Sequence, residues 1–155
     1  MIDLHRLLVP TDFGKSSDNA LTYAIAFAQK FGAEVWLLHV VQDLSLFIPE
    51  AVFITPPPAP PVEQFIAAAR TALERVVARL NVDGVSVHSE VGVGPPYDEI
   101  VRVAREKAID LIVMGTHGHT GLAHVLLGSV AEKVVRRAPC PVLTVRHPEH
   151  EFVHP

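Results

Sequence analysis

The chain has 155 residues, of which 49% are hydrophobic, so it is long enough for one domain with a sizeable core and is not expected to form two. Its formal net charge is -4 at pH 7, and it contains no run of lysine or arginine, which disfavours a nucleic-acid or membrane surface. A single cysteine excludes an intramolecular disulfide, no apolar run reaches transmembrane length, and the amino terminus lacks signal-peptide features, so the expected location is cytoplasmic.

The first 41 residues predict a strand, a helix and a second strand. Residues 4–10 form a short apolar strand, and apolar residues at helical spacing follow over 16–31. Gly32 stands where a helix-ending glycine is expected. The expected N-cap residues of this helix are Ser16, Ser17 and Asp18. Residues 34–41 are too continuously apolar for a half-exposed strand, so this unit predicts a parallel pair joined by a right-handed crossover.

Residues 42–61 interrupt the alternation with six prolines. Proline lacks the N–H group that a strand ladder needs, so we expect a long exposed loop or lid rather than a linker between domains. The apolar residues of this segment leave two interpretations open, a lid or partner contact and a mobile loop. At the other end of the chain, residues 147–155 are expected to form a solvated tail.

The second half of the chain again alternates helices with strands. Gly92-Val93-Gly94 is followed by two prolines, which indicates a turn before a helix. The predicted elements are a helix over 62–80, an alternating edge strand over 85–91, a helix over 96–107, a buried strand over 111–114, a helix ending near 137 and a strand over 140–145. Five strands and four helices predict one doubly wound α/β sandwich.

A glycine-rich segment directly follows the strand at 111–114. Its glycines are Gly115, Gly118, Gly121 and Gly128, and Ser129 follows the last of them. Glycine lets the backbone approach a ligand closely, and the helix expected to begin near residues 122–128 adds unpaired N–H groups that favour phosphate. The segment contains no lysine or arginine, so the backbone is expected to supply most of the binding.

Two common phosphate-binding templates do not fit this segment. A Walker A loop requires a lysine before its final serine or threonine, and Gly128-Ser129 lacks it; Gly14-Lys15-Ser16 has the lysine but not the first glycine. A dinucleotide fingerprint requires G-x-G-x-x-G, whereas the first three glycines here are spaced by threes. The remaining pattern is G-x2-G-x9-G-S, from Gly115 to Ser129.

This pattern resembles the G-2x-G-9x-G-[ST] motif of the nucleotide-binding branch of the universal stress protein family. Further family marks are Val9-Pro10-Thr11-Asp12, Leu38-His39-Val40, Gly94-Pro95, the segment 108–115 and the last strand, from Cys140 to Val145. The resemblance covers about residues 4–146 and implies a Rossmann-like parallel sheet with strand order 3-2-1-4-5. Ligands of such sheets bind at the carboxyl ends of the strands where the winding reverses, and Asp12 and Gly115 stand at two of those ends.

The resemblance also implies how an adenine nucleotide would be bound. Asp12 would accept hydrogen bonds from a ribose hydroxyl or an adenine amino group, and apolar side chains would enclose the adenine. The glycine loop and the turn at 128–130 would cradle the phosphates. The expected ligand-binding residues are Pro10, Thr11, Asp12, Val40, Met114, Gly115, Thr116, His117, Gly118, His119, Thr120, Gly121, Gly128, Ser129 and Val130.

Structural explanations compete for four of these residues. Asp12 can serve as a cap for the helix over 16–31. Val40 and Met114 can be core residues that merely touch a ligand. Gly128 can mark a close packing position of a helix.

The histidines have competing explanations as well. His117, His119 and His124 have a spacing suited to a transition metal, but no cysteine or carboxylate nearby completes a ligand set, so we expect exposed histidines beside the phosphates. His39 is expected to be a hydrogen-bonded strand histidine. Cys140 is expected to be an inert buried thiol.

We therefore expect an ATP-binding universal stress protein that acts in regulation of a stress response, with Mg²⁺ carried in by the phosphates. A hydrolase needs a group that orients water and a cation near the γ-phosphate, and neither is evident, so hydrolysis is expected to be slow or absent. A weak ATPase and a nucleotide-independent dimeric interaction protein are the alternatives. The apolar last strand predicts a homodimer, because a bare apolar edge strand promotes association, and related proteins pair through it.

Overall fold

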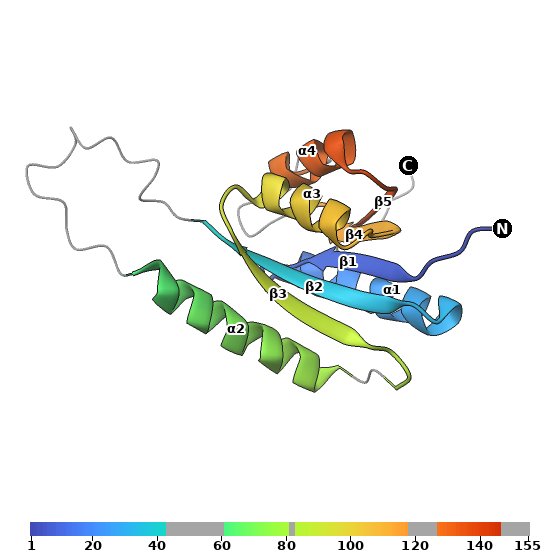
Figure 1. Ribbon diagram of the computed structural model, residues 1–155, viewed down its shortest axis with the longest axis horizontal. Coiled ribbons are helices and arrows are strands. Elements are labelled where there is room, and N and C mark those ends of the chain that lie inside the picture. Colours follow the sequence, from blue (N-terminus) through green and yellow to red (C-terminus); the bar gives the residue numbers. More distant parts are fainter. Residues whose placement is uncertain (43–60, 81–82, 118–126, 147–155) are drawn as a thin grey trace, which may run out of the picture.

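The computed structural model describes residues 1–42, 61–80, 83–117 and 127–146 (Figure 1). The predictions for the proline-rich segment and for the tail at 147–155 therefore fall almost entirely outside the described residues. In the described part, no helix is both long enough and apolar enough to cross a membrane.

Helices and strands alternate along the whole described chain. In chain order they are β1 (Arg6–Pro10), α1 (Lys15–Phe31), β2 (Glu34–Val41), α2 (Val62–Arg79), β3 (Val87–Val93), α3 (Pro96–Glu106), β4 (Leu111–Gly115), α4 (Ser129–Arg137) and β5 (Val142–Val145). The strands form one parallel sheet in the order β3-β2-β1-β4-β5. This confirms the expected doubly wound α/β fold and its strand order.

The central strands are buried on both faces, as their continuous apolar sequences predict. Successive side chains of a strand point to opposite faces. Leu7 and Val9 of β1 therefore pack in one core with residues of α1 and α2, whereas Leu8 packs in a second core with residues of α3 and α4. Figure 1 shows the same division, with α1 and α2 on one side of the sheet and α3 and α4 on the other.

The winding of the sheet reverses between β1 and β4. β1 pairs with β2 on one side and with β4 on the other, where Leu7 lies opposite Leu111 and Leu8 opposite Ile112. The element that follows β1 is α1, on one face of the sheet, and the next described element after β4 is α4, on the other face. The carboxyl ends of β1 and β4 therefore form the switch point at which ligands of such sheets bind.

The outer strand β3 begins two residues later than its alternating sequence predicts. Its pairing with β2 extends from Val35 opposite Val87 to Val41 opposite Val93, so the register with β2 sets its bounds. The expectation that it is an edge strand is confirmed. The glycine pair after it forms a turn into α3, in which Gly94 has φ 136 and Pro96 is the first helical residue.

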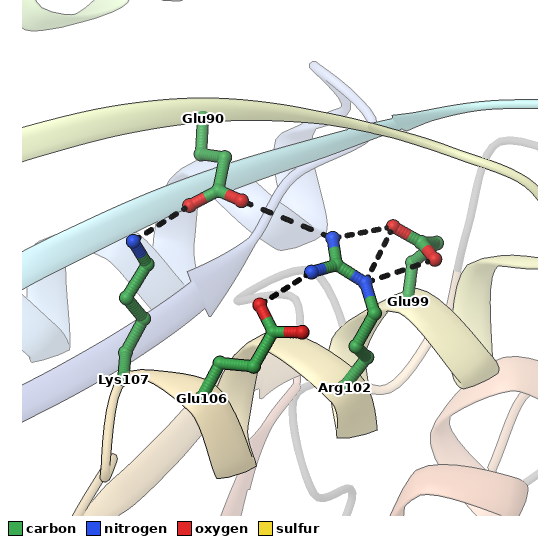
Figure 2. Close-up of polar contacts among 5 residues, drawn as sticks. All are labelled: Glu90, Glu99, Arg102, Glu106 and Lys107. Atoms are coloured by element: carbon green, nitrogen blue, oxygen red, sulfur yellow. Dashed lines mark hydrogen bonds and ion pairs between the residues drawn. The ribbon is translucent and has the colours of Figure 1, made fainter.

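A cluster of charged side chains fixes β3 to α3 (Figure 2). Arg102 lies at its centre, with its guanidinium 2.8 Å from Glu99, 2.6 Å from Glu106 and 3.9 Å from Glu90 of β3. The hydrogen bonds that Arg102 donates to the carboxylates of Glu99 and Glu106 raise the pKa of its guanidinium. A Cβ atom on Gly92 would lie only 2.8 Å from Glu99 Oε2, so this glycine leaves room for the cluster.

The expected N-caps of α1 are wrong. The helix begins at Lys15, its N-cap residue is Gly14, and no side chain caps it among the described residues. Ser16 and Ser17 lie inside the first turn, because the turn that follows β1 already directs the chain into the helix. The C-terminal prediction is confirmed: Gly32 adopts φ 68, and its N–H donates to the carbonyl of Ala28.

Candidate functional site

The turn between β1 and α1 forms the first part of the site. Thr11 is buried, and its N–H donates to the carbonyl of Leu38 over 2.8 Å. His39 Nδ1 lies 2.8 Å from the Thr11 carbonyl oxygen, and because a carbonyl only accepts, this ring nitrogen carries the proton. Phe13 has φ 62, and its ring centroid lies 4.4 Å from that of His39. β2 therefore holds this turn at several points, and His39 is a hydrogen-bonded strand histidine as predicted.

Asp12 stands in the middle of this turn and is half-buried. Its Oδ1 accepts hydrogen bonds from the Gly14 N–H and from the Ser17 hydroxyl, each over 2.9 Å. The residue is not the N-cap of α1, but it stabilises the entry into that helix. An ionised carboxylate offers about four acceptor positions, so this structural role leaves capacity for a ligand.

The end of β4 forms the second part of the site. Met114 and Thr116 are buried, and Gly115 between them is half-buried. The Thr116 N–H donates to the Val145 carbonyl over 3.1 Å, and its hydroxyl lies 2.8 Å from His117 Nδ1. The bond to Val145 holds the chain directly after β4 against β5.

Gly115 is in close contact with the start of α1. A Cβ atom at this position would overlap Ser16 Oγ and would lie 2.9 Å from the Ser16 carbonyl carbon. The first turn of α1 therefore packs directly on the end of β4. This contact is a reason for glycine at position 115 that does not involve a ligand. It also brings the start of α1 to the switch point.

The beginning of α4 forms the third part of the site. The Gly128 N–H donates to the Thr116 carbonyl over 2.7 Å, and a Cβ atom on Gly128 would lie 3.0 Å from that same oxygen. The structure thus supports close packing as one reason for this glycine. Ser129 is exposed, Val130 is half-buried, and no side-chain cap is present among the described residues. A helix start of this kind offers N–H groups and a positive dipole end to an anion.

Some of the remaining predicted residues are described by the structure, and the others lie outside the described residues. Pro10 and Val40 are half-buried at or near the ends of β1 and β2, and Val40 and Met114 share one apolar cluster, so both contribute to the core. The structure thus places the described predicted residues at the ends of β1, β2 and β4 and at the start of α4. The predictions for Gly118, His119, Thr120, Gly121 and His124 lie outside the described residues.

Two lysines and the cysteine are further residues with reactive or charged side chains. Lys133 Nζ lies over the Tyr97 ring, 4.9 Å from its centroid, so this lysine is directed toward α3. Lys15 is the exposed first residue of α1. Cys140 is half-buried, and its burial raises the pKa of the thiol, as does the nearby charge of Asp110. Within the described residues, no group of three or more His, Cys, Asp or Glu side chains is placed to hold a metal ion.

Ser16 and Ser17 make tertiary contacts that the sequence does not predict. Both serines were expected to cap α1, whereas one packs on Gly115 and the other donates to Asp12. Serine near a helix start is such a common cap that the sequence offers no signal for a tertiary role here. Asp12 and Ser17 are five positions apart, and only the structure of the turn between them shows that their side chains form a hydrogen bond.

The fold and the site define a Rossmann-like α/β protein whose switch point combines a carboxylate-bearing turn with a glycine-dependent helix start. Residues 4–146 match the sequence model of the universal stress protein family, and the chain belongs to this family.

Individual relatives agree with this assignment over nearly the whole chain. Universal stress protein MJ0531 of Methanocaldococcus jannaschii is 40% identical over 151 residues, which cover 94% of this chain and 84% of that protein. The solved structure of MJ0577 from the same organism superposes with a TM-score of 0.76 at 32% identity, covering 94% of this chain and 97% of that one. A universal stress protein crystallised in complex with cAMP has a TM-score of 0.63 at 26% identity, covering 94% and 99% of the two chains.

Proposed function

We propose that this protein binds ATP at the switch point between β1 and β4 and acts as a regulatory module in a stress response. The observation that carries this proposal is the contact of Gly128 with Thr116, which fixes the start of α4 beside the end of β4. The family member in complex with cAMP supports an adenine nucleotide as the ligand.

Each part of the proposed site has a distinct task. The phosphates lie at the start of α4, which no side chain of the described residues caps and where Ser129 adds a hydroxyl, and they bring Mg²⁺ with them. The carboxylate of Asp12 accepts hydrogen bonds from the nucleoside. Pro10, Val40 and Met114 provide an apolar surface for the adenine. Nucleotide occupancy then changes the surface near the glycine loop that a partner contacts.

Slow or absent hydrolysis is part of the proposal. Stabilising the charge on a transferring phosphoryl group requires a cation close to it. The ammonium group of Lys133 in α4 lies over the Tyr97 ring of α3, which favours binding over turnover. A weak ATPase remains the alternative, and it is tested by following the ADP fraction by mass spectrometry during storage of the purified protein.

We further propose a cytoplasmic homodimer that pairs through the last strand, which is predicted from Cys140 to Val145 and observed as β5 over Val142–Val145. β5 is an outer strand of the sheet, and its residues Val142 and Leu143 are half-buried. An apolar strand with one unpaired edge is a template for pairing with a second copy.

A calorimetric titration with Mg-ATP tests the binding proposal. In Gly128→Val the side chain would crowd the Thr116 carbonyl and displace the start of α4, so we expect affinity to fall by at least about tenfold, the equivalent of one lost interaction of about 1.4 kcal/mol. Val135→Ala, at an exposed position of the same helix, is the matched control and should bind like the wild type. Equal affinities for Gly128→Val and wild type would remove the phosphate site from this helix start.

A further inference from the structure

Ser17 is a buried polar residue whose hydroxyl lies among three oxygen atoms. Its side chain belongs to the first turn of α1, where helical side chains point back toward the N-terminus. Ser17 Oγ lies 2.9 Å from Asp12 Oδ1, 2.9 Å from the Gly14 carbonyl oxygen and 3.1 Å from Thr11 Oγ1. Each of these atoms belongs to the turn that carries Asp12.

The single proton of this hydroxyl fixes the direction of the hydrogen bonds. An ionised acceptor forms the stronger bond, so Ser17 donates to the Asp12 carboxylate, and its own oxygen is left to accept from the Thr11 hydroxyl. Thr11 Oγ1 in turn accepts from the Phe13 N–H over 3.0 Å. The resulting chain runs from the backbone of Phe13 through Thr11 and Ser17, and each donor points toward Asp12.

This chain determines how the carboxylate is held. Asp12 Oδ1 receives two protein donors, the Gly14 N–H and the Ser17 hydroxyl, which restrict the orientation of the carboxylate. Without the Ser17 hydroxyl, one of these two bonds is lost, and the buried Thr11 hydroxyl loses its acceptor. The orientation of the carboxylate is then less restricted, and its lone pairs align less well with a hydrogen-bond donor of the nucleoside.

We propose that Ser17 is a positioning residue of the nucleotide site, which orients Asp12 toward the nucleoside through a buried chain of hydroxyl groups. The inference rests on the proposed ATP site and adds to it a residue that does not touch the nucleotide. It predicts that Ser17 affects affinity only while the Asp12 carboxylate is present.

A double-mutant cycle separates this positioning role from a structural one. Mg-ATP affinity is measured by calorimetry for wild type, Ser17→Ala, Asp12→Ala and the double variant. We expect Ser17→Ala to weaken binding about tenfold, the equivalent of one charge-assisted hydrogen bond of about 1.5 kcal/mol. In the Asp12→Ala background the same change should shift affinity less than about twofold, because its effect is transmitted through Asp12. Equal losses in both backgrounds would overturn the proposal.

Thr22→Ala is the matched control on the same helix. Thr22 is exposed, and its hydroxyl donates to the Asp18 carbonyl over 3.1 Å, so this variant removes a similar back-bonded hydroxyl without touching the turn. It should bind Mg-ATP like the wild type. If Ser17→Ala does not fold, Ser17→Cys keeps a weak donor of similar shape and takes its place in the cycle, with a smaller loss expected in the wild-type background.

The proposed function and this inference fail in different ways. A wild-type protein that binds neither Mg-ATP nor cAMP overturns the nucleotide site, and the inference with it. A wild-type protein that binds Mg-ATP while Ser17→Ala binds equally well overturns the inference alone.

Discussion

At the scale of single residues, the two described glycines of the candidate site, Gly115 and Gly128, serve the protein's own packing. Gly115 makes room for Ser16, and Gly128 makes room for the Thr116 carbonyl. Both glycines also belong to the pattern that resembles the family's phosphate-binding motif, so a lost ligand after mutation does not by itself identify a ligand contact. The two roles are separated by measuring stability in the absence of nucleotide.

We predict that Gly115→Ala destabilises the nucleotide-free protein by about 1–3 kcal/mol, because the added methyl group overpacks the contact with α1. Urea denaturation at neutral pH measures this free energy of unfolding. Val135→Ala, at an exposed position, should change it little. A Gly115→Ala protein that is as stable as the wild type, yet binds no nucleotide, would mean that the ligand alone requires this glycine.

At the scale of elements, charged side chains connect strands that are distant in the sequence. Glu34 of β2 accepts hydrogen bonds from Arg6 of β1 over 2.9 Å and from His88 of β3 over 3.1 Å. Desolvation opposes ionisation of Glu34, but these hydrogen bonds outweigh it and lower the pKa of the carboxyl. These three residues lie near the amino-terminal ends of their strands, at the end of the sheet away from the candidate site.

This lowered pKa predicts a pH-dependent contribution to stability. Because the folded protein binds the Glu34 proton less tightly than the unfolded chain, the contribution is complete above the unfolded pKa of about 4.3 and is lost as the pH falls through the folded value. The difference in unfolding free energy between wild type and Glu34→Gln should therefore be present at pH 6 and vanish in more acidic solution. Urea denaturation across this range measures it, with Glu74→Gln on α2 as control. A difference independent of pH would contradict the prediction.

At the scale of the whole molecule, the sequence predicted the fold better than the site. Apolar patterns located most of the nine elements of the described chain, because strands buried on both faces and helices with one apolar face have distinct patterns, and charged helix ends indicated α3. The strand order came from the family resemblance. The contact of Ser16 with Gly115 and the bond from Ser17 to Asp12 were not predictable, since both depend on how α1 meets β4 and the preceding turn.

The proposed dimer is also a property of the whole molecule. A lysine on the unpaired edge of β5 should block strand pairing, so Thr144→Lys is expected to be monomeric. Ser89→Lys, on the opposite outer strand β3, is the matched control and should remain dimeric. Light scattering measures the mass, and the wild type should show twice the 16.9 kDa of one chain. A monomeric wild type would contradict the dimer without affecting the nucleotide site.

The central claim is that this protein binds an adenine nucleotide at the switch point. Mass spectrometry of the small molecules released when freshly purified protein is denatured tests it most directly, with Gly128→Val purified in parallel. We expect ATP or ADP from the wild type and not from the variant, and an ADP fraction that rises slowly or not at all during storage. A wild-type protein that releases no nucleotide, and shows no thermal shift with added Mg-ATP, would contradict it and favour a nucleotide-independent interaction protein on the same fold.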